Sequence, residues 1–223
     1  MIDKKITLII FDWDGTLIDS AAHISDCLLS SIAELPLEPR TAQQVNDMIG
    51  LSLDAAIAGL YPTISSKTHD QLAGLFRKKI MLVGTKPSPL FPFATHVLAQ
   101  LKSAGYDLAV ATGNSRVGLD RAMNETGLTE YFPVTRCADE TFSKPHPQML
   151  EEIITDYNIK AGEALMIGDS EYDLQMANNI KMPALAVSYG VHKRERLLAH
   201  KPVAIKDDLQ AVADFILADA KLS

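Results

Sequence analysis

The sequence has few cysteines and no long hydrophobic run. Its 223 residues include only Cys27 and Cys137, which lie far apart and form neither a disulfide framework nor a metal-ligand pattern. No apolar stretch approaches the roughly 20 residues that span a bilayer, so we expect no membrane partner. Asp3, Lys4 and Lys5 lead straight into an apolar run, and we therefore expect a cytoplasmic protein by default.

Positive charge is also scarce. The chain has 21 Lys and Arg residues against 28 Asp and Glu residues, which gives a formal net charge of −7. A general nucleic-acid partner is therefore disfavoured, because phosphate backbones attract clustered cations. A small anionic substrate is still compatible, since one or two cations near a helix N-terminus can bind a phosphate. The hydrophobic content of 47% suffices for a substantial core, as one elaborated domain or two unequal ones.

Predicted strands and helices alternate along most of the chain. Continuous apolar runs predict strands at residues 6–10, 106–111, 164–167 and 184–187. Helical patterns lie between or after them, at residues 94–102, 115–126 and 147–157. This alternation predicts an α/β fold with a doubly wound parallel sheet.

One interval departs from this alternation. Residues 18–84 show only helical periodicity, at 24–35, 41–48, 53–60 and 68–83. Because connections in compact domains are usually a few residues long, an insertion of this size predicts a separate helical subdomain. The proline-rich stretch Lys86–Pro92 predicts a stiff return to the main domain, which would then comprise residues 1–17 and 85–223.

Polar groups follow the ends of the predicted strands or the loops just after them: Asp12 with Asp14, Thr112 with Gly113 and Asn114, Lys144, and Asp169 with Asp173. Four carboxylates in one crevice repel each other, and a bound cation relieves that repulsion. Ligands made only of oxygen suit a hard ion such as Mg²⁺, which often shares its coordination sphere with a phosphate. The Thr112 hydroxyl, nearby backbone N–H groups and Lys144 suit the phosphate itself.

Each of these groups also has a purely structural interpretation. Thr112 and its neighbours could cap a helix, and Lys144 could be a solvated loop lysine. Asp169 and Asp173 could stabilise a helix N-terminus against its dipole. The joint occurrence of all four groups at strand ends favours the functional interpretation.

Four segments carry a resemblance to a known family: Phe11–Ser20, Ala111–Ser115, Ser143–Pro147 and Gly168–Asp173. In this order they resemble the four motifs of the haloacid dehalogenase superfamily. More narrowly, the chain resembles the phosphoglycolate phosphatase-like branch, in which a helical cap follows the first motif. The resemblance implies a Rossmann-like catalytic core, at residues 1–17 and 85–223, with a cap domain at residues 18–84.

The resemblance also implies roles for the acidic residues. Asp12 would be the nucleophile that forms a phosphoaspartyl intermediate, and Asp14 would protonate the leaving oxygen and then activate water. Mg²⁺ would be held by the Asp12 side chain, the Asp14 backbone carbonyl and Asp169. Asp173 would support this metal site.

The remaining motif residues would bind the phosphoryl group. Thr112 and Lys144 would hold it, together with the Gly113 and Asn114 region. The implied function is an Mg²⁺-dependent phosphomonoesterase, monomeric or homodimeric, acting on a small phosphorylated metabolite, with phosphoglycolate as the best single candidate. A sugar-phosphate mutase resembling β-phosphoglucomutase is an alternative, and a non-catalytic binding protein on the same fold is another. A dehalogenase is disfavoured, because those relatives lack the counterpart of Asp14.

Several further positions bear on the site. His23 could face the active site, or it could be a surface or packed histidine. The basic residues within 193–196 resemble a solvated helix face. The loop 49–52 resembles the cap loop that covers the site in relatives. Where relatives commonly carry Pro-Gly, this chain has Pro92-Phe93, so the following helix is expected to start differently.

Overall fold

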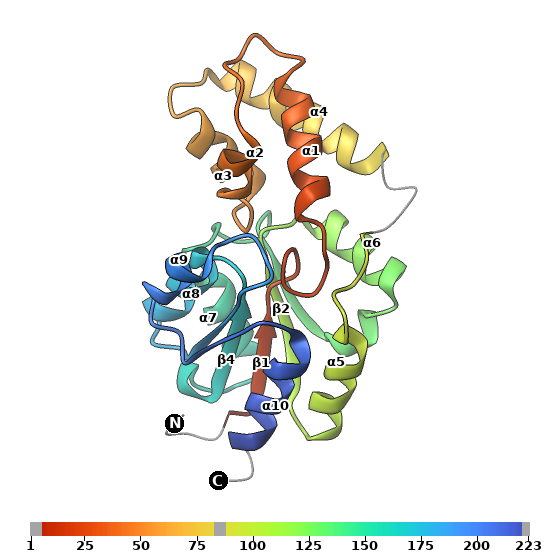
Figure 1. Cartoon of the computed structure of the whole chain (residues 1–223), viewed down its shortest axis with the longest axis vertical. Helices are drawn as coiled ribbons and strands as arrows, with labels where there is room; N and C mark the ends of the chain where they lie inside the picture. Colours follow the sequence, from red (N-terminus) through yellow and green to blue (C-terminus); the bar gives the residue numbers. More distant parts are fainter. Residues whose placement is uncertain (1–5, 83–87, 220–223) are drawn as a thin grey trace.

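The part of the chain that the structure describes contains one six-stranded parallel sheet (Figure 1). The computed structural model describes residues 6–82 and 88–219. The sheet order is β3-β2-β1-β4-β5-β6, and every neighbouring pair is parallel. The strands are β1 (Leu8–Phe11), β2 (Asp107–Thr112), β3 (Val134–Cys137), β4 (Ala164–Gly168), β5 (Ala184–Val187) and β6 (Ala204–Lys206). The predicted α/β fold class is confirmed, although the sequence does not predict the edge strands β3 and β6.

Helices cover both faces of the sheet. Side chains of β1 alternate between the faces, with Ile9 and Phe11 on one and Leu8 and Ile10 on the other. The first face packs against α5 (Ala94–Ser103), α6 (Arg116–Thr126) and α10 (Leu209–Asp219). The second packs against α7 (Gln148–Asp156), α8 (Glu171–Asn179) and α9 (Arg194–Leu198). Short 3₁₀ helices lie at Thr129–Tyr131 and Ala161–Glu163.

Of the described helices between β1 and β2, the first four stand at the end of the sheet where the strands terminate (Figure 1). They are α1 (Ala21–Ile32), α2 (Ala42–Asn46), α3 (Leu53–Leu60) and α4 (Ser66–Leu82). They enclose an apolar cluster of their own, which includes Leu28, Ile32, Ile57, Leu60 and Leu72. We call these four helices and their connections the helical insertion. No helix among the described residues is both long enough and apolar enough to cross a bilayer.

The two segments that connect the helical insertion to the sheet lie side by side. The backbone N–H of Asp19 donates to the Pro89 carbonyl at 2.8 Å, and that of Phe91 donates to the Leu17 carbonyl at 3.0 Å. Ile18 and Leu90 form the antiparallel bridge between them. Outgoing and returning chains are thus held together at the base of the insertion.

Some of the expectations from sequence concern residues outside the described ranges. These are the charged positions 3–5, the predicted boundary between residues 84 and 85, position 83 of the predicted fourth insertion helix, and positions 86 and 87 of the predicted linker. The predicted helices of the insertion otherwise correspond to α1–α4, with ends shifted by a few residues.

Phe93 begins α5 in a backbone conformation that aromatic residues rarely adopt. Its φ is 68°, in the left-handed region, and its side chain is 55% exposed. The Cβ atom makes this conformation cost about 1–2 kcal/mol relative to glycine. The helix thus starts differently, as expected: Phe93, at the position where relatives commonly carry glycine, adopts a strained backbone conformation.

Replacing Phe93 by glycine is expected to stabilise the protein. The relief of backbone strain should exceed the entropy that glycine loses on folding, for a net gain of about 0.5–1 kcal/mol in the free energy of unfolding. Urea denaturation would measure this gain. Phe93→Ala is the matched control, because alanine removes the ring but keeps Cβ. Equal stabilisation by both variants would contradict the strain argument.

Candidate active site

The predicted site residues meet in a crevice at the carboxyl ends of three central strands. Asp12 follows β1, Thr112 ends β2 and Asp169 follows β4. The chain passes from β1 to β2 and β3 on one side, and then returns to place β4 on the other side. In doubly wound sheets, ligands bind in the crevice that such a reversal opens.

A tight turn after β1 fixes Asp12 against β4. The Asp12 N–H donates to the Ile167 carbonyl at 2.8 Å, and the Asp12 Oδ1 accepts from the Trp13 N–H at 2.7 Å. Gly15 has a φ of +82°, and a Cβ added there would lie 2.3 Å from Asp169 Oδ2. Glycine is required at this turn both for its backbone conformation and for the close approach of Asp169.

Lys144 is enclosed between two of the predicted acidic residues. Its Nζ lies 2.8 Å from Asp12 Oδ1 and 2.6 Å from Asp173 Oδ1. All three side chains are buried. The interpretation of Lys144 as a solvated loop lysine is therefore wrong.

Asp169 and Asp173 are oriented by neighbouring donors. Asp169 Oδ1 accepts from the Thr16 hydroxyl at 2.9 Å, and its Oδ2 accepts from the Val191 N–H at 2.7 Å. Asp173 Oδ2 accepts from both the N–H and the hydroxyl of Ser170, at 3.1 and 2.7 Å. Asp173 thus caps α8, as the structural interpretation holds, and also places its other oxygen at Lys144.

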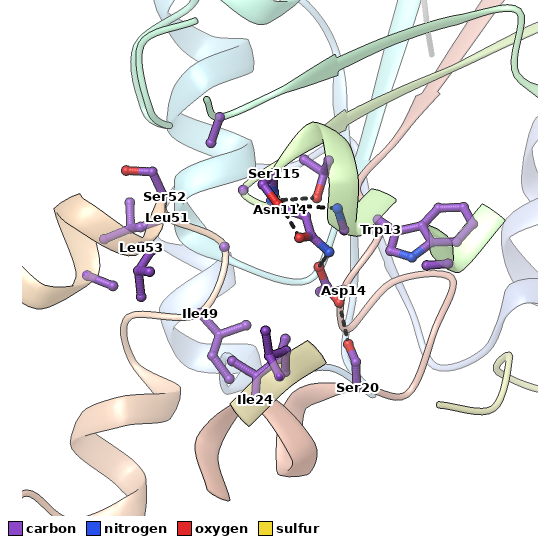
Figure 2. A pocket seen from close by; sticks show the side chains of 18 of the residues that line it. Trp13, Asp14, Ser20, Ile24, Ile49, Leu51, Ser52, Leu53, Asn114 and Ser115 are labelled. Carbon is purple, nitrogen blue, oxygen red and sulfur yellow. Dashed lines mark hydrogen bonds between the residues drawn. The ribbon is translucent and has the colours of Figure 1, made fainter. Parts of the chain in front are cut away.

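Asp14 belongs to a hydrogen-bonded chain that links β1, β2 and the helical insertion (Figure 2). Its Oδ1 accepts from the Ser20 hydroxyl at 2.6 Å, and its Oδ2 accepts from the Asn114 side-chain amide at 3.3 Å. Thr112 Oγ1 accepts from the Asn114 N–H at 3.1 Å. Ser115 then caps α6 by accepting from the Gly118 N–H. The Asp14 carboxylate is therefore held in one orientation beside the Thr112 loop.

Burial dominates the electrostatics of these acids. It raises the pKa of Asp12 well above its ordinary range, although Lys144 opposes this shift. Burial likewise raises the pKa of Asp14, and burial together with Asp173 raises the pKa of Asp169 to about 7. For Lys144, burial alone would lower the pKa, but the carboxylates of Asp12 and Asp173 outweigh it and raise the pKa above its usual value. One lysine does not neutralise three buried carboxylates.

The chemistry of these residues fits a hard divalent cation. Among the described residues, Asp12, Asp169 and Asp173 each offer an oxygen, and these atoms lie within 4.8 Å of one another. Asp12 Oδ2 is buried and has no hydrogen-bond partner. A buried carboxylate oxygen without a donor is costly, and a cation would satisfy it. The Asp14 side chain is not in this group. The family resemblance assigns the backbone carbonyl of Asp14, and not its side chain, to the metal.

The loop of residues 49–52 lies over the site. A Cβ added at Gly113 would be 2.5 Å from the Gly50 carbonyl oxygen and 2.6 Å from that of Leu51. The Ser52 N–H also donates to the Ser143 hydroxyl at 2.8 Å. Between the insertion and the sheet remains a cavity of about 530 Å³, with Asp12 and Asp14 in its lining.

Two further positions are informative. His23 is half-buried, lines the cavity and also packs against its own helix, with Nε2 3.9 Å from Cys27 Sγ, so it combines features of both interpretations. Arg196 does not fit the predicted solvated helix face. Its guanidinium is half-buried, lies 2.9 Å from Asp47 Oδ1 of the insertion and also pairs with Glu171. The prediction that Arg196 is solvated is therefore wrong. It failed because Asp47 and Glu171, the acidic partners of Arg196, lie far from it in the sequence.

Sequence reasoning missed three residues that support the site. Thr16 and Val191 donate to Asp169, and Ser143 accepts from the loop 49–52. Thr16 lies inside the first motif and Ser143 directly precedes Lys144, so proximity to a motif is a signal for both. Nothing in the sequence near Val191 indicates its contact.

The fold is that of an α/β protein with a parallel doubly wound sheet, and its lysine-bridged carboxylate cluster lies at the switch point, where such sheets bind their ligands. Residues 9–187 match the family model described as haloacid dehalogenase-like hydrolase. The chain belongs to this family of hydrolases, and the resemblance seen in the four motifs is confirmed.

Similar proteins extend over the whole chain. A protein of Dickeya dadantii named "Probable phosphatase IndB" is 31% identical over 97% of this chain and 96% of its own length. A phosphoglycolate phosphatase of Vibrio vulnificus is 28% identical over 99% of this chain and all of its own length. The crystal structure of a "predicted phosphatase" from Clostridium acetobutylicum, 24% identical, superposes with a TM-score of 0.87 over 96% of this chain and all of that chain. This last similarity supports the fold.

Proposed function

We propose that the protein is an Mg²⁺-dependent phosphomonoesterase that hydrolyses a small phosphorylated metabolite through a phosphoaspartyl intermediate on Asp12. The observation that carries this proposal is the buried Asp12 carboxylate, bound by Lys144 through Oδ1 and without a partner at Oδ2. With Oδ2 left to a cation, the carboxylate keeps its second oxygen, Oδ1, to attack phosphorus.

The proposed reaction has two steps. In the first, an Asp12 carboxylate oxygen bonds to phosphorus while the bond from phosphorus to the ester oxygen breaks, and Asp14 gives its proton to that leaving oxygen. In the second, Asp14 takes a proton from water as the water oxygen attacks phosphorus and releases Asp12. The raised pKa of Asp14, caused by burial, favours the protonated form that the first step needs. Ser20 and Asn114 orient its carboxylate.

Other residues of this chain would hold the phosphoryl group. Lys144 supplies a fixed positive charge beside Asp12, and this charge reduces repulsion between the nucleophile and the substrate. The Thr112 hydroxyl and the Gly113 N–H, in the loop that precedes α6, would donate to phosphoryl oxygens. Asp12, Asp169, Asp173 and the Asp14 carbonyl would hold Mg²⁺. When bound, Mg²⁺ would neutralise charge on the phosphoryl oxygens and on the carboxylate cluster.

Phosphoglycolate is the first substrate to test, because full-length relatives such as that of Vibrio vulnificus are named phosphoglycolate phosphatase. The net charge of −7 fits a small metabolite better than a nucleic acid. We further propose that the protein acts in the cytoplasm, as a monomer or a homodimer.

We expect the purified protein to release inorganic phosphate from at least one ester in a panel of small phosphorylated metabolites when Mg²⁺ is present. A chelator should lower the rate by at least about 100-fold, because the carboxylate cluster then lacks its counter-charge, and added Mg²⁺ should restore it. Free phosphate and sugar-phosphate isomers would both be measured, since a mutase would interconvert isomers without net release. Activity that persists undiminished in chelator would contradict the metal assignment. No release from any ester would contradict the proposed function.

A further inference from the structure

The cavity above Asp12 is large for a two-carbon substrate. Its volume is about 530 Å³, within the range of pockets that bind drug-sized ligands. The phosphate of a substrate would occupy the end at Asp12, next to Thr112 and Gly113, which also line the cavity. An organic part as small as that of phosphoglycolate would leave most of the remaining volume to water.

The wall that faces this remaining volume is largely apolar. The helical insertion contributes aliphatic and aromatic side chains from all four of its helices and from the loop after α2, among them Ile24, Val45, Ile49, Leu53, Phe76 and Ile80. Figure 2 shows Ile24 and Ile49 on the side of Asp14 that faces the insertion, with Leu51 and Leu53 beyond them. Water in contact with such a wall is unfavourable, and an apolar ligand that displaces it gains free energy.

Charges in the cavity lining disfavour a second anionic group on the substrate. Besides Asp12 and Asp14, the lining includes Asp54, Glu125 and Asp139. Among the described lining residues there are two arginines, and both have acidic partners. Arg77 lies 3.8 Å from Asp54, and Arg121 lies 2.7 Å from Glu125. A carboxylate beyond the phosphate would therefore compete with acidic side chains for each arginine.

We infer that the preferred substrates are phosphate monoesters whose organic part is uncharged, largely apolar and long enough to reach the wall formed by Ile24, Ile49 and Phe76. This inference deepens the proposed function and rests on it, because it assigns the substrate class of the same site. Phosphoglycolate, with its short and charged organic part, should then be a weaker substrate than an apolar ester of comparable reactivity.

A series of n-alkyl phosphates with two, four, six and eight carbons would test the inference on the full chain with Mg²⁺. The concentrations would stay below those at which the esters aggregate. We expect kcat/KM for phosphate release to rise by up to about fourfold per methylene group, which corresponds to about 0.8 kcal/mol for each one buried. The longer esters should exceed phosphoglycolate in kcat/KM. A flat or falling series, or a preference for phosphoglycolate, would overturn the inference.

Two matched variants would locate the effect in the apolar wall. Ile24→Gln should lower the ratio of kcat/KM for octyl phosphate to that for ethyl phosphate by about tenfold, since it places an amide in the wall. Leu75→Gln is the control, because Leu75 is also a half-buried aliphatic residue of the insertion but does not line the cavity. A ratio measured on one preparation does not depend on how much of the variant is folded. Equal ratios in the two variants would overturn the assignment of this wall.

The same measurements separate failure of this inference from failure of the proposed function. If phosphoglycolate or ethyl phosphate is hydrolysed with Mg²⁺ but the longer esters are not favoured, the substrate class is wrong and the phosphatase proposal stands. If neither these esters nor any member of the metabolite panel releases phosphate, both are wrong. Binding of octyl phosphate to the Asp12→Asn variant, measured by calorimetry, would report on the wall without turnover and should be weaker when Ile24→Gln is added.

Discussion

Asp12→Asn should lower kcat for phosphate release by at least about 10⁴-fold, the order of loss that follows removal of a catalytic nucleophile. A carboxamide oxygen is a far poorer nucleophile than a carboxylate, and the amide nitrogen would meet the Lys144 ammonium or the cation site. The fold should persist, because Lys144 keeps its 2.6 Å bond to Asp173. Steady-state phosphate release, with unfolding monitored in parallel, would measure both effects.

Trapping of the intermediate gives an independent readout of the same prediction. Brief mixing of the wild-type protein with substrate, followed by acid quench and mass spectrometry, should show one phosphoryl group on the peptide that contains Asp12, and the variant should show none. Asp26→Asn is the matched control, since it makes the same chemical change at an exposed position of α1 and should retain wild-type activity. Substantial turnover by Asp12→Asn would contradict a covalent role for this residue.

The central strands were predictable because they are buried on both faces. β1, β4 and β5 are buried throughout, and each reads as a continuous apolar run. The edge strand β3 contains Arg136, whose guanidinium pairs with Glu152 and Asp156 at the surface. The other edge strand, β6, has three half-buried residues. Because each edge strand has one side open to solvent, its sequence lacks the continuous apolar run by which the central strands were predicted.

The residues of the candidate site were predictable where a reactive side chain directly follows a strand in the sequence. Asp12 and Asp169 directly follow β1 and β4, so parallel topology alone brings them together. The donors to Asp169 were not predictable in the same way, because each bond joins positions far apart in sequence. Thr16 lies 153 residues from Asp169 and Val191 lies 22 residues from it. Such pairs depend on how loops pack after the sheet has formed.

The cavity wall was the least predictable part of the molecule. Helical periodicity indicates which residues of the insertion are apolar, but it does not separate those that fill the insertion's own core from those that face the sheet. Leu28 contributes to both, whereas Leu72 is buried only in that core. The way in which the insertion helices cross decides which apolar residues face the cavity. The motifs contain none of this information, so they indicated a phosphate site but not the size or polarity of its substrate.

Lys144 provides the prediction with the largest expected effect on stability. Its ammonium lies within salt-bridge distance of both Asp12 and Asp173, while Asp169 lies in the same buried cluster. Lys144→Met keeps a similar length and apolar stem but removes the charge. In chelator, the variant should lose about 3–5 kcal/mol of unfolding free energy, because breaking a buried ion pair leaves uncompensated charge. Urea denaturation would measure this loss.

The matched control is Lys67→Met, which makes the same change at an exposed position of α4 and should alter stability by less than about 0.5 kcal/mol. Phosphate release by Lys144→Met should fall by about 10²–10³-fold, the loss typical of removing one charge-stabilising group. A loss of stability below about 1 kcal/mol would show that the carboxylates do not depend on this lysine.

Further measurements can show whether Lys144→Met loses stability through repulsion between carboxylates or through a packing defect. Unpaired buried carboxylates have raised pKa values, so protonation at lower pH should relieve their repulsion, and the destabilisation by Lys144→Met should shrink as the pH is lowered. Adding Asp12→Asn to Lys144→Met should recover part of the lost stability, because one of the repelling charges is gone. Added Mg²⁺ should likewise stabilise Lys144→Met more than it stabilises the wild-type protein, since the cation would replace the missing charge. A packing defect would be insensitive to pH, to the second substitution and to Mg²⁺, and that result would contradict the electrostatic role assigned to Lys144.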